Sequence, residues 1–202
     1  MAIDPNHSRL YSRLEHHSIS NMSLVIAFLW GMAEGTLFFM VPDVYLTLIA
    51  LIHWRIGLSA TFVTVAGAMV GGAIMYTLAV YDGALMAKVL TLIPLVSMEM
   101  LHTVATQMQT YGFGAMVRFP LQAPYKVYAV EAGQQHLPFL TFLLITIPSR
   151  LGRILPVTFV GVLLGAVLKK FIQRHTEFVV GVHVLVWVGV HVLAYLWMNR
   201  VI

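Results

Sequence analysis

Long apolar stretches separated by short polar ones run along most of the 202-residue chain. A helix needs roughly 20 mostly apolar residues to cross a membrane. The pattern therefore predicts an all-α integral membrane protein with room for about six apolar segments. Apolar stretches cover residues 22–52, 56–81, 111–147, 154–168 and 177–199, and a stretch with the spacing of an amphipathic helix lies at 95–108.

The first apolar stretch contains two acidic residues, Glu34 and Asp43, and Pro42 directly precedes the second. A carboxylate at membrane depth costs roughly 2.5–3.5 kcal/mol, and proline removes a backbone donor from a helix. A broken backbone is stable at that depth only where it is buried in protein or lines an aqueous cavity. We therefore expect two half-helices that enter the membrane and return, with both acids near the break. The alternative is one kinked spanning helix in which Glu34 pairs with a neighbour.

A second apolar stretch is interrupted in a similar way by Pro120 and Pro124, and cations flank this break, Arg118 on one side and Lys126 on the other. The chain then continues as an apolar run that ends before Pro148. Two prolines so close together are incompatible with an unbroken helix. We therefore expect a second broken segment here.

The two halves of the chain show the same order of sequence features. Each has an apolar approach, a proline-containing break with charges, and a later segment with two glycines four residues apart, Gly67 and Gly71 in the first half and Gly161 and Gly165 in the second. Glycines at this spacing let helices approach closely. Because transporter folds often pair such broken helices as inverted repeats, we expect two re-entrant hairpins of this kind. The alternative is a coincidental similarity.

Composition agrees with a membrane location. Hydrophobic residues make up 59% of the chain and charged residues 10%, against about 25% charged in soluble domains, and the mean hydropathy is +0.85. The chain has no cysteine, which excludes thiolate metal sites and cysteine nucleophiles. It also lacks a dense basic stripe with interleaved aromatic residues, so we expect no nucleic-acid partner.

The N-terminal residues 1–21 are polar and lack the apolar core of a signal peptide. We expect them to form a disordered or weakly helical cytoplasmic tail, followed by a single polytopic membrane domain over residues 22–202. Arg9 and Arg13 precede the first apolar stretch, which favours a cytoplasmic N-terminus because Lys and Arg concentrate on that side of a membrane.

Several of these residues resemble the signature of the DedA superfamily, also called VTT or SNARE-associated, and most of all its YqaA-like branch. The resemblance covers about residues 30–170, and its most specific part is the Pro-Tyr-Lys segment. Phe39, Val41 and Gln122 stand where that branch has prolines, so the chain resembles a divergent member. The residues that carry the resemblance are Glu34-x4-Phe39-x2-Pro42-Asp43, Pro124-Tyr125-Lys126, Gly133 and Arg150-x2-Arg153.

The resemblance implies a multi-pass protein of the bacterial inner membrane with two inward-facing re-entrant hairpins. Relatives are implicated in moving undecaprenyl phosphate or phospholipids such as phosphatidylethanolamine between leaflets, with dependence on the proton motive force. By resemblance, Glu34 and Asp43 are the membrane-embedded acids and Lys126 is a basic partner. The further basic candidates are Arg118, Arg150 and Arg153, and the residues that shape the hairpins are Pro42, Pro120, Pro124 and Gly133.

Physical chemistry supports a lipid phosphate as the ligand without the resemblance. A phosphate headgroup that crosses a bilayer needs a polar path and a cation, and both arginine and lysine bind phosphate. A nearby carboxylate could hold that cation when the ligand is absent, and could titrate because burial raises its pKa. The alternatives are a structural or partner-binding protein whose charges only organise the helices, and, less favoured, an intramembrane hydrolase with Glu34 and Asp43 as an acid pair. No enzyme motif or cofactor-binding motif is present.

Two histidines, His183 and His191, lie eight residues apart in the last apolar stretch. They are too far apart to bind one metal ion together, so we expect no metal site. Interhelical hydrogen bonding is the simpler role for them, and a proton relay is the alternative. The basic residues at 169, 170 and 174 predict a cytoplasmic loop just before this stretch, which would place the C-terminus outside.

Overall fold

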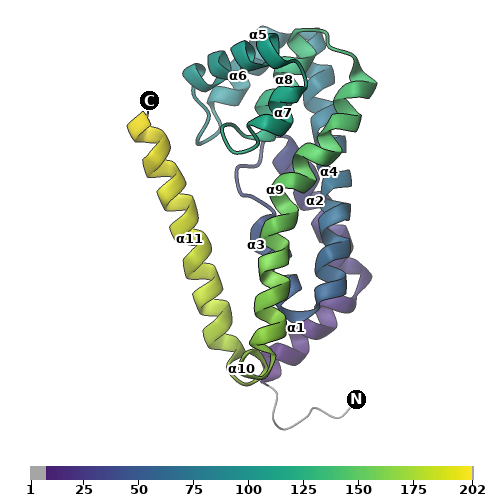
Figure 1. The fold of residues 1–202 in the computed structure, drawn as a ribbon, viewed down its shortest axis with the longest axis vertical. Helices are drawn as coiled ribbons and strands as arrows, with labels where there is room; N and C mark the ends of the chain where they lie inside the picture. Colours follow the sequence, from purple (N-terminus) through teal and green to yellow (C-terminus); the bar gives the residue numbers. More distant parts are fainter. Residues whose placement is uncertain (1–7, 202) are drawn as a thin grey trace. The chain divides into compact units, whose positions relative to one another are not determined.

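The computed structural model describes the backbone of residues 8–201 and the side chains of residues 8–196. Every regular element in this part of the chain is a helix, in agreement with the all-α prediction. The helices are α1 (Arg9–Ile19), α2 (Asn21–Gly35), α3 (Asp43–Ile52), α4 (Trp54–Tyr81), α5 (Gly83–Thr91), α6 (Met98–Tyr111), α7 (Gly114–Arg118), α8 (Tyr125–Gln134), α9 (Phe139–Val167), α10 (Lys169–Arg174) and α11 (Thr176–Val201) (Figure 1).

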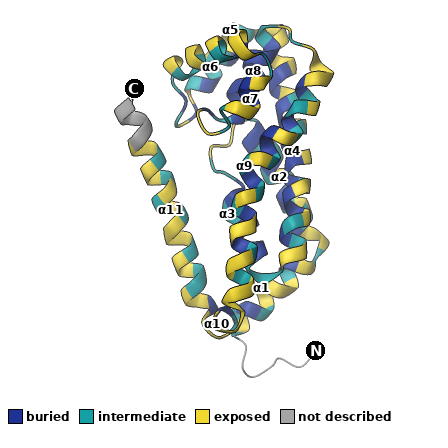
Figure 2. Cartoon of the chain, viewed as in Figure 1, coloured by how far each residue is buried: buried dark blue, intermediate teal, exposed yellow. Residues whose placement is uncertain are grey.

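Three of the described helices are long and apolar enough to cross a membrane: α4, α9 and the Thr176–Leu196 part of α11. Length and composition therefore make this a membrane protein. Half of the most apolar part of α4 is buried by other helices, whereas the corresponding part of α11 has no buried residue (Figure 2). The remaining apolar segments form shorter helices. The described residues therefore contain three candidate spanning helices, fewer than the expected number of about six membrane segments.

Helix α9 passes through Pro148 without a break. The sequence pattern had placed the end of one apolar run before this proline and the start of another at Ile154. A proline removes one backbone hydrogen bond, but membrane helices tolerate the loss when neighbouring groups satisfy the freed carbonyl. As a consequence, Arg150 and Arg153 lie within one helix of spanning length rather than between two apolar segments.

The chain forms two compact units. Unit 1 comprises Met1–Ala27, Pro42–Thr61 and Leu155–Ile202, and unit 2 comprises Phe28–Val41 and Phe62–Ile154. Helices α2, α4 and α9 each contribute residues to both units. The single membrane domain expected for residues 22–202 stays a prediction.

Helix α1 is an integral part of unit 1. Ser8 caps the helix by accepting a hydrogen bond from the Tyr11 backbone N–H at 3.0 Å, and its hydroxyl donates to Thr176 at 2.8 Å. Tyr11 and Ser18, which lie on the same face of the helix, are buried. The expectation of a disordered or weakly helical tail over 1–21 is therefore wrong for residues 8–20, because one face of this polar segment packs onto the fold; residues 1–7 lie outside the described part.

Elsewhere in unit 1, α3 packs closely against α9 through the glycine pair Gly161 and Gly165. A Cβ on Gly165 would lie 2.6 Å from the carbonyl oxygen of Leu51, and one on Gly161 would lie 3.1 Å from that of Thr47. Glycine is needed at these positions because the two backbones are nearly in contact.

In unit 2 a glycine pair on α4 meets a glycine pair on α2. A Cβ on Gly67 would overlap the carbonyl oxygen of Phe28, and a Cβ on Gly31 would overlap that of Thr64. Gly35 and Gly71 likewise face each other, with 3.1 Å between a Cβ on Gly71 and the Cα of Gly35. The close approach holds the last turns of α2, which carry Glu34, directly on α4.

The rest of unit 2 packs around α8, whose residues from Tyr125 to Gly133 are all buried. Helices α5 and α6 both contact α8, and α6 does so through Val104 and Met108. The predicted amphipathic helix at 95–108 therefore corresponds to α6, although the helix begins later, at Met98. Burial of α8 places the residues of the second proline-containing segment inside unit 2.

Candidate functional site: a buried cluster of charged residues

The first broken segment consists of two separate helices. Helix α2 ends at Gly35, one residue after Glu34, and α3 begins at Asp43, directly after Pro42. The backbone between them is held by α2, because the Phe38 N–H donates to the Ala33 carbonyl at 2.9 Å and the Trp30 indole donates to the Met40 carbonyl at 3.1 Å. The alternative of one continuous kinked helix is therefore wrong, although its pairing of Glu34 with a neighbour is observed.

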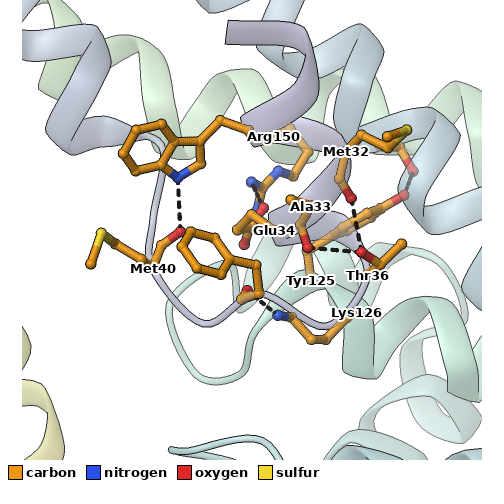
Figure 3. A network of polar contacts seen from close by, with 11 residues as sticks. Met32, Ala33, Glu34, Thr36, Met40, Tyr125, Lys126 and Arg150 are labelled. Atoms are coloured by element: carbon orange, nitrogen blue, oxygen red, sulfur yellow. Dashed lines mark hydrogen bonds and ion pairs between the residues drawn. The ribbon is translucent and has the colours of Figure 1, made fainter. Parts of the chain in front are cut away.

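Glu34 forms an ion pair with Arg150 of α9, and both side chains are almost completely buried (Figure 3). Each carboxylate oxygen accepts from a different guanidinium nitrogen, one of these contacts measuring 3.4 Å between Nη1 and Oε1. The guanidinium also lies 5.2 Å from the ring centroid of Tyr125, whose hydroxyl is 3.0 Å from that of Thr146. This forked geometry fixes the plane and direction of the guanidinium.

Lys126 is among the largest fully buried side chains of the described residues, with 1% of its surface exposed. Its ammonium donates to the carbonyl oxygen of Phe38, at 2.6 Å, within the break that follows α2 (Figure 3). The contact joins the start of α8 to the break after α2. The structure thus brings together one residue from each of the two proline-containing segments.

Two cations and an acid come together in this cluster. Lys126 and Arg150 are buried near Glu34, and the first turn of α8 adds the partial positive charge of a helix N-terminus. Another buried acid of unit 2, Glu131, accepts from Gln135 at 2.7 Å. Buried charges are costly unless they are compensated. The two cations are the groups of this cluster that can bind an anionic ligand.

Arg153 lines a small pocket beside this cluster, together with Arg150, Pro120, Tyr128 and Ser149. The pocket holds only about 10 Å³, close to the minimum for a single water molecule. A phosphate group is larger than this. This pocket is therefore too small for a phosphate group.

Other predicted site residues lie elsewhere. Arg118 is exposed and stacks on aromatic rings, with its guanidinium carbon 5.0 Å from the centroid of Tyr111 and 5.6 Å from that of Phe119. Asp43 is buried in the first turn of α3, which belongs to unit 1. The structure therefore gives Arg118 no place in the cluster, and Asp43 belongs to a different unit from Glu34.

The predicted hairpin residues have different structural roles. Pro42 and Pro124 occupy the positions directly before α3 and α8, where a missing N–H costs no helical hydrogen bond. Gly133 lies inside α8 rather than in a turn, and a Cβ there would overlap the Tyr76 carbonyl oxygen of α4. Gly133 therefore serves close packing of two helices.

The histidines of α11 make hydrogen bonds to backbone carbonyls. The Nε2 of His183 lies 2.9 Å from the Val44 carbonyl oxygen, and the neighbouring Trp187 donates to the Thr47 hydroxyl at 3.1 Å. His191 bonds within its own helix, from Nδ1 to the Trp187 carbonyl at 2.7 Å. His183 therefore joins α11 to α3, as the interhelical interpretation expected. A proton-relay role stays a prediction for both histidines.

The sequence interpretation assigned no role to several residues that build the site. Tyr125 appeared only as part of a motif, and the Phe38 carbonyl had no signal, because any residue can supply a backbone oxygen. The pair Gly31 and Gly35 does have a signal, since it shows the same four-residue spacing as the glycines of α4. That spacing on both helices would have predicted their contact.

Comparison of the chain with protein-family models, with curated proteins and with solved structures gives no match. The DedA resemblance therefore depends on the motif residues alone. A functional assignment has to rest on the buried cluster and on the membrane character of the fold.

Proposed function

We propose that this membrane protein moves a phosphate-bearing lipid between leaflets, and that Glu34, Lys126 and Arg150 handle its headgroup. The observation that carries the proposal is the burial of the forked Glu34–Arg150 ion pair together with Lys126. The class of ligand is a phospholipid or undecaprenyl phosphate, as the resemblance to the DedA superfamily suggests. No metal or cofactor is needed for this function.

The geometry of Arg150 supports a phosphate ligand. Its guanidinium already binds a forked, two-oxygen anion in the form of the Glu34 carboxylate, and a phosphate presents oxygens with a similar spacing. The headgroup would replace Glu34 on Arg150, and the Lys126 ammonium would supply the second positive charge. The Glu34 carboxylate thus remains bound to Arg150 while the lipid is absent.

The small size of the pocket beside Arg150 suggests how the cycle begins. Because this pocket accommodates no phosphate, the proposed cycle starts with separation of the Glu34–Arg150 pair. The Glu34 carboxylate and the headgroup would then alternate as partners of the Arg150 guanidinium.

We also propose that α2 with α3, and α7 with α8, form two re-entrant hairpins of an inverted repeat. Helix α2 has 15 residues and α3 has 10, so they rise about 22 Å and about 15 Å, less than the roughly 30 Å of a bilayer core. The packing agrees with this plan: α3 lies against α9 in unit 1, and α8 lies against α4 in unit 2, where Gly133 meets Tyr76. In each unit, the second arm of one hairpin contacts the long helix that follows the other hairpin.

The charge distribution supports an orientation with the N-terminus in the cytoplasm, in the bacterial inner membrane. Among the described residues of unit 1, six cations lie outside the candidate spans or in the first turn of one. The acids in such positions number three, Glu15, Asp43 and Glu177. Cytoplasmic loops carry such an excess of Lys and Arg. These cations are Arg9, Arg13, Arg55, Lys169, Lys170 and Arg174.

Single cysteines at Phe39 and Gln122 should react with small water-soluble thiol reagents in intact membranes if both breaks line an aqueous cavity. Both side chains are exposed in unit 2, and the chain has no native cysteine that would add background. Cysteine at Leu92, an exposed residue between α5 and α6, is the labelled control, and cysteine at Leu185 of α11 is the protected one. Protection of both 39 and 122, with Leu92 labelled, would contradict the re-entrant arrangement.

Replacing Lys126 with methionine should slow lipid exchange at least about tenfold, the effect of roughly 1.4 kcal/mol on a barrier. Methionine keeps the apolar stem but removes the charge that the headgroup needs. The measurement is leaflet-resolved exchange of a labelled phospholipid, and of a polyprenyl phosphate, by purified protein in vesicles. Lys88→Met, at an exposed lysine of α5, is the matched control.

A purely structural role is the alternative, and the buried Glu34–Arg150 pair favours that role too. The same Lys126→Met protein distinguishes it from transport. A role in organising the helices predicts a lower unfolding temperature and low yield, with exchange per folded protein unchanged. A transport role predicts lost exchange in protein that remains folded. Wild-type exchange rates in folded Lys126→Met protein would overturn the assignment of this residue.

A further inference from the structure

Unit 1 contains a second candidate site, whose lining residues all belong to that unit. It is a cavity of about 310 Å³ where α1, the end of α3, the start of α4, the end of α9 and α10 meet. This volume is at the lower end of the range of ligand pockets, roughly 300–1,000 Å³. Its lining residues are Tyr11, Ala50, Leu51, Ile52, Trp54, Val162, Gly165, Ala166, Lys169 and Ile172.

The wall of this cavity is mostly apolar, and its one charged lining residue is a cation. Aliphatic residues form most of the lining, and Lys169 is the charged residue among them. Trp54 adds an exposed indole, on which the Arg55 guanidinium stacks with 5.1 Å from its carbon to the ring centroid. An apolar wall with a cation at one side is complementary to an amphiphile that has an anionic head and a hydrocarbon tail.

The ends of all three candidate spans place this cavity at the depth of lipid headgroups. Trp54 begins the α4 span, Lys169 follows the end of the α9 span by two residues, and Thr176 begins the α11 span. Tryptophan is enriched at this depth, and basic pockets between membrane helices on the cytoplasmic side bind anionic headgroups. A lipid of the surrounding leaflet can therefore reach the cavity without leaving the membrane.

We propose that this cavity binds one acyl chain of an anionic phospholipid, with the lipid phosphate on Lys169. The volume accommodates part of a single chain rather than a whole lipid, so the remaining chain stays in the bilayer. The site binds a resident lipid at the membrane surface and is independent of headgroup handling by Glu34, Lys126 and Arg150. Lipid bound here joins α1 and α10 to the ends of α3, α4 and α9.

The test measures how many lipids the purified full-length protein retains, by native mass spectrometry from detergent supplemented with phosphatidylglycerol or phosphatidylcholine. Wild-type protein should retain phosphatidylglycerol in preference to phosphatidylcholine. Lys169→Gln should reduce that preference about fivefold, the contribution of one lysine near an anionic headgroup. Lys170→Gln removes the neighbouring exposed charge of α10, which does not line the cavity, and should leave the preference unchanged.

A second pair of variants tests the apolar wall. Ala166→Trp fills the cavity and should lower retention of the bound phosphatidylglycerol, whereas Leu163→Trp, on an exposed part of α9 outside the lining, should not. Equal loss with Lys169→Gln and Lys170→Gln would mean a diffuse surface charge and overturn the proposal. Equal retention of both lipids by wild-type protein, or an unchanged count with Ala166→Trp, would overturn it as well. None of these variants changes a residue of the Lys126 site. The result for lipid retention in the cavity is therefore independent of the result for lipid exchange.

Discussion

Replacing Glu34 with glutamine should destabilise the folded protein by about 3–5 kcal/mol, the usual cost of removing one partner from a buried ion pair. Arg150 would then lose the ion pair with Glu34 while it remains buried in a cluster that also holds Lys126. The measurement is the thermal unfolding midpoint of purified protein in detergent. Glu99→Gln, at an exposed acid in the first turn of α6, should change the midpoint little.

The double variant Glu34→Gln with Arg150→Gln tests whether the buried charge of Arg150 causes the loss of stability in Glu34→Gln. Removing both partners takes away the buried Arg150 charge as well as the carboxylate that compensates it, so part of the lost stability should return even though the ion pair is absent. A double variant that is less stable than Glu34→Gln alone would show that Arg150 stabilises the fold through other contacts, among them the stacking on Tyr125.

Replacing Gly67 with alanine should also destabilise the protein strongly, by about 1–3 kcal/mol as for other overpacked sites. The added Cβ would overlap the Phe28 carbonyl oxygen and lie 2.9 Å from its carbon. Because the obstacle is backbone, α2 and α4 would have to move apart, which would also shift Glu34 relative to Arg150. Thermal unfolding and protein yield from membranes measure the effect.

Gly152→Ala is the matched control for this prediction. Gly152 is also inside a long apolar helix, α9, but a Cβ there meets nothing within 4 Å. Alanine should therefore be neutral or slightly stabilising, because it has the higher helix propensity. Equal stability of the two alanine variants would contradict the close contact between α2 and α4.

The helix break at Pro42 and the unbroken helix at Pro148 illustrate what the sequence could and could not predict. Proline restricts its own backbone and that of the preceding residue, so a break near Pro42 and Asp43 follows from local chemistry, and α2 and α3 are separate helices there. Pro148 was misread as a boundary between two apolar runs. Helix α9 continues through Pro148 and Pro156, because membrane helices can tolerate proline, and the sequence around a proline does not show when they do.

The sequence by itself determined that this is an all-helical protein with apolar helices of membrane-spanning length, because hydrophobic content and the period of apolar positions are local properties. It also determined that charged residues interrupt two of the apolar stretches. Only the tertiary structure decided which charges meet. Arg150 pairs with Glu34 and Lys126 reaches a carbonyl of the other broken segment, whereas Arg118 is exposed. These partners are chosen by how α2, α8 and α9 pack. Glycines allow both α2 and α8 to approach the backbone of α4 closely, and these contacts join residues far apart in the chain.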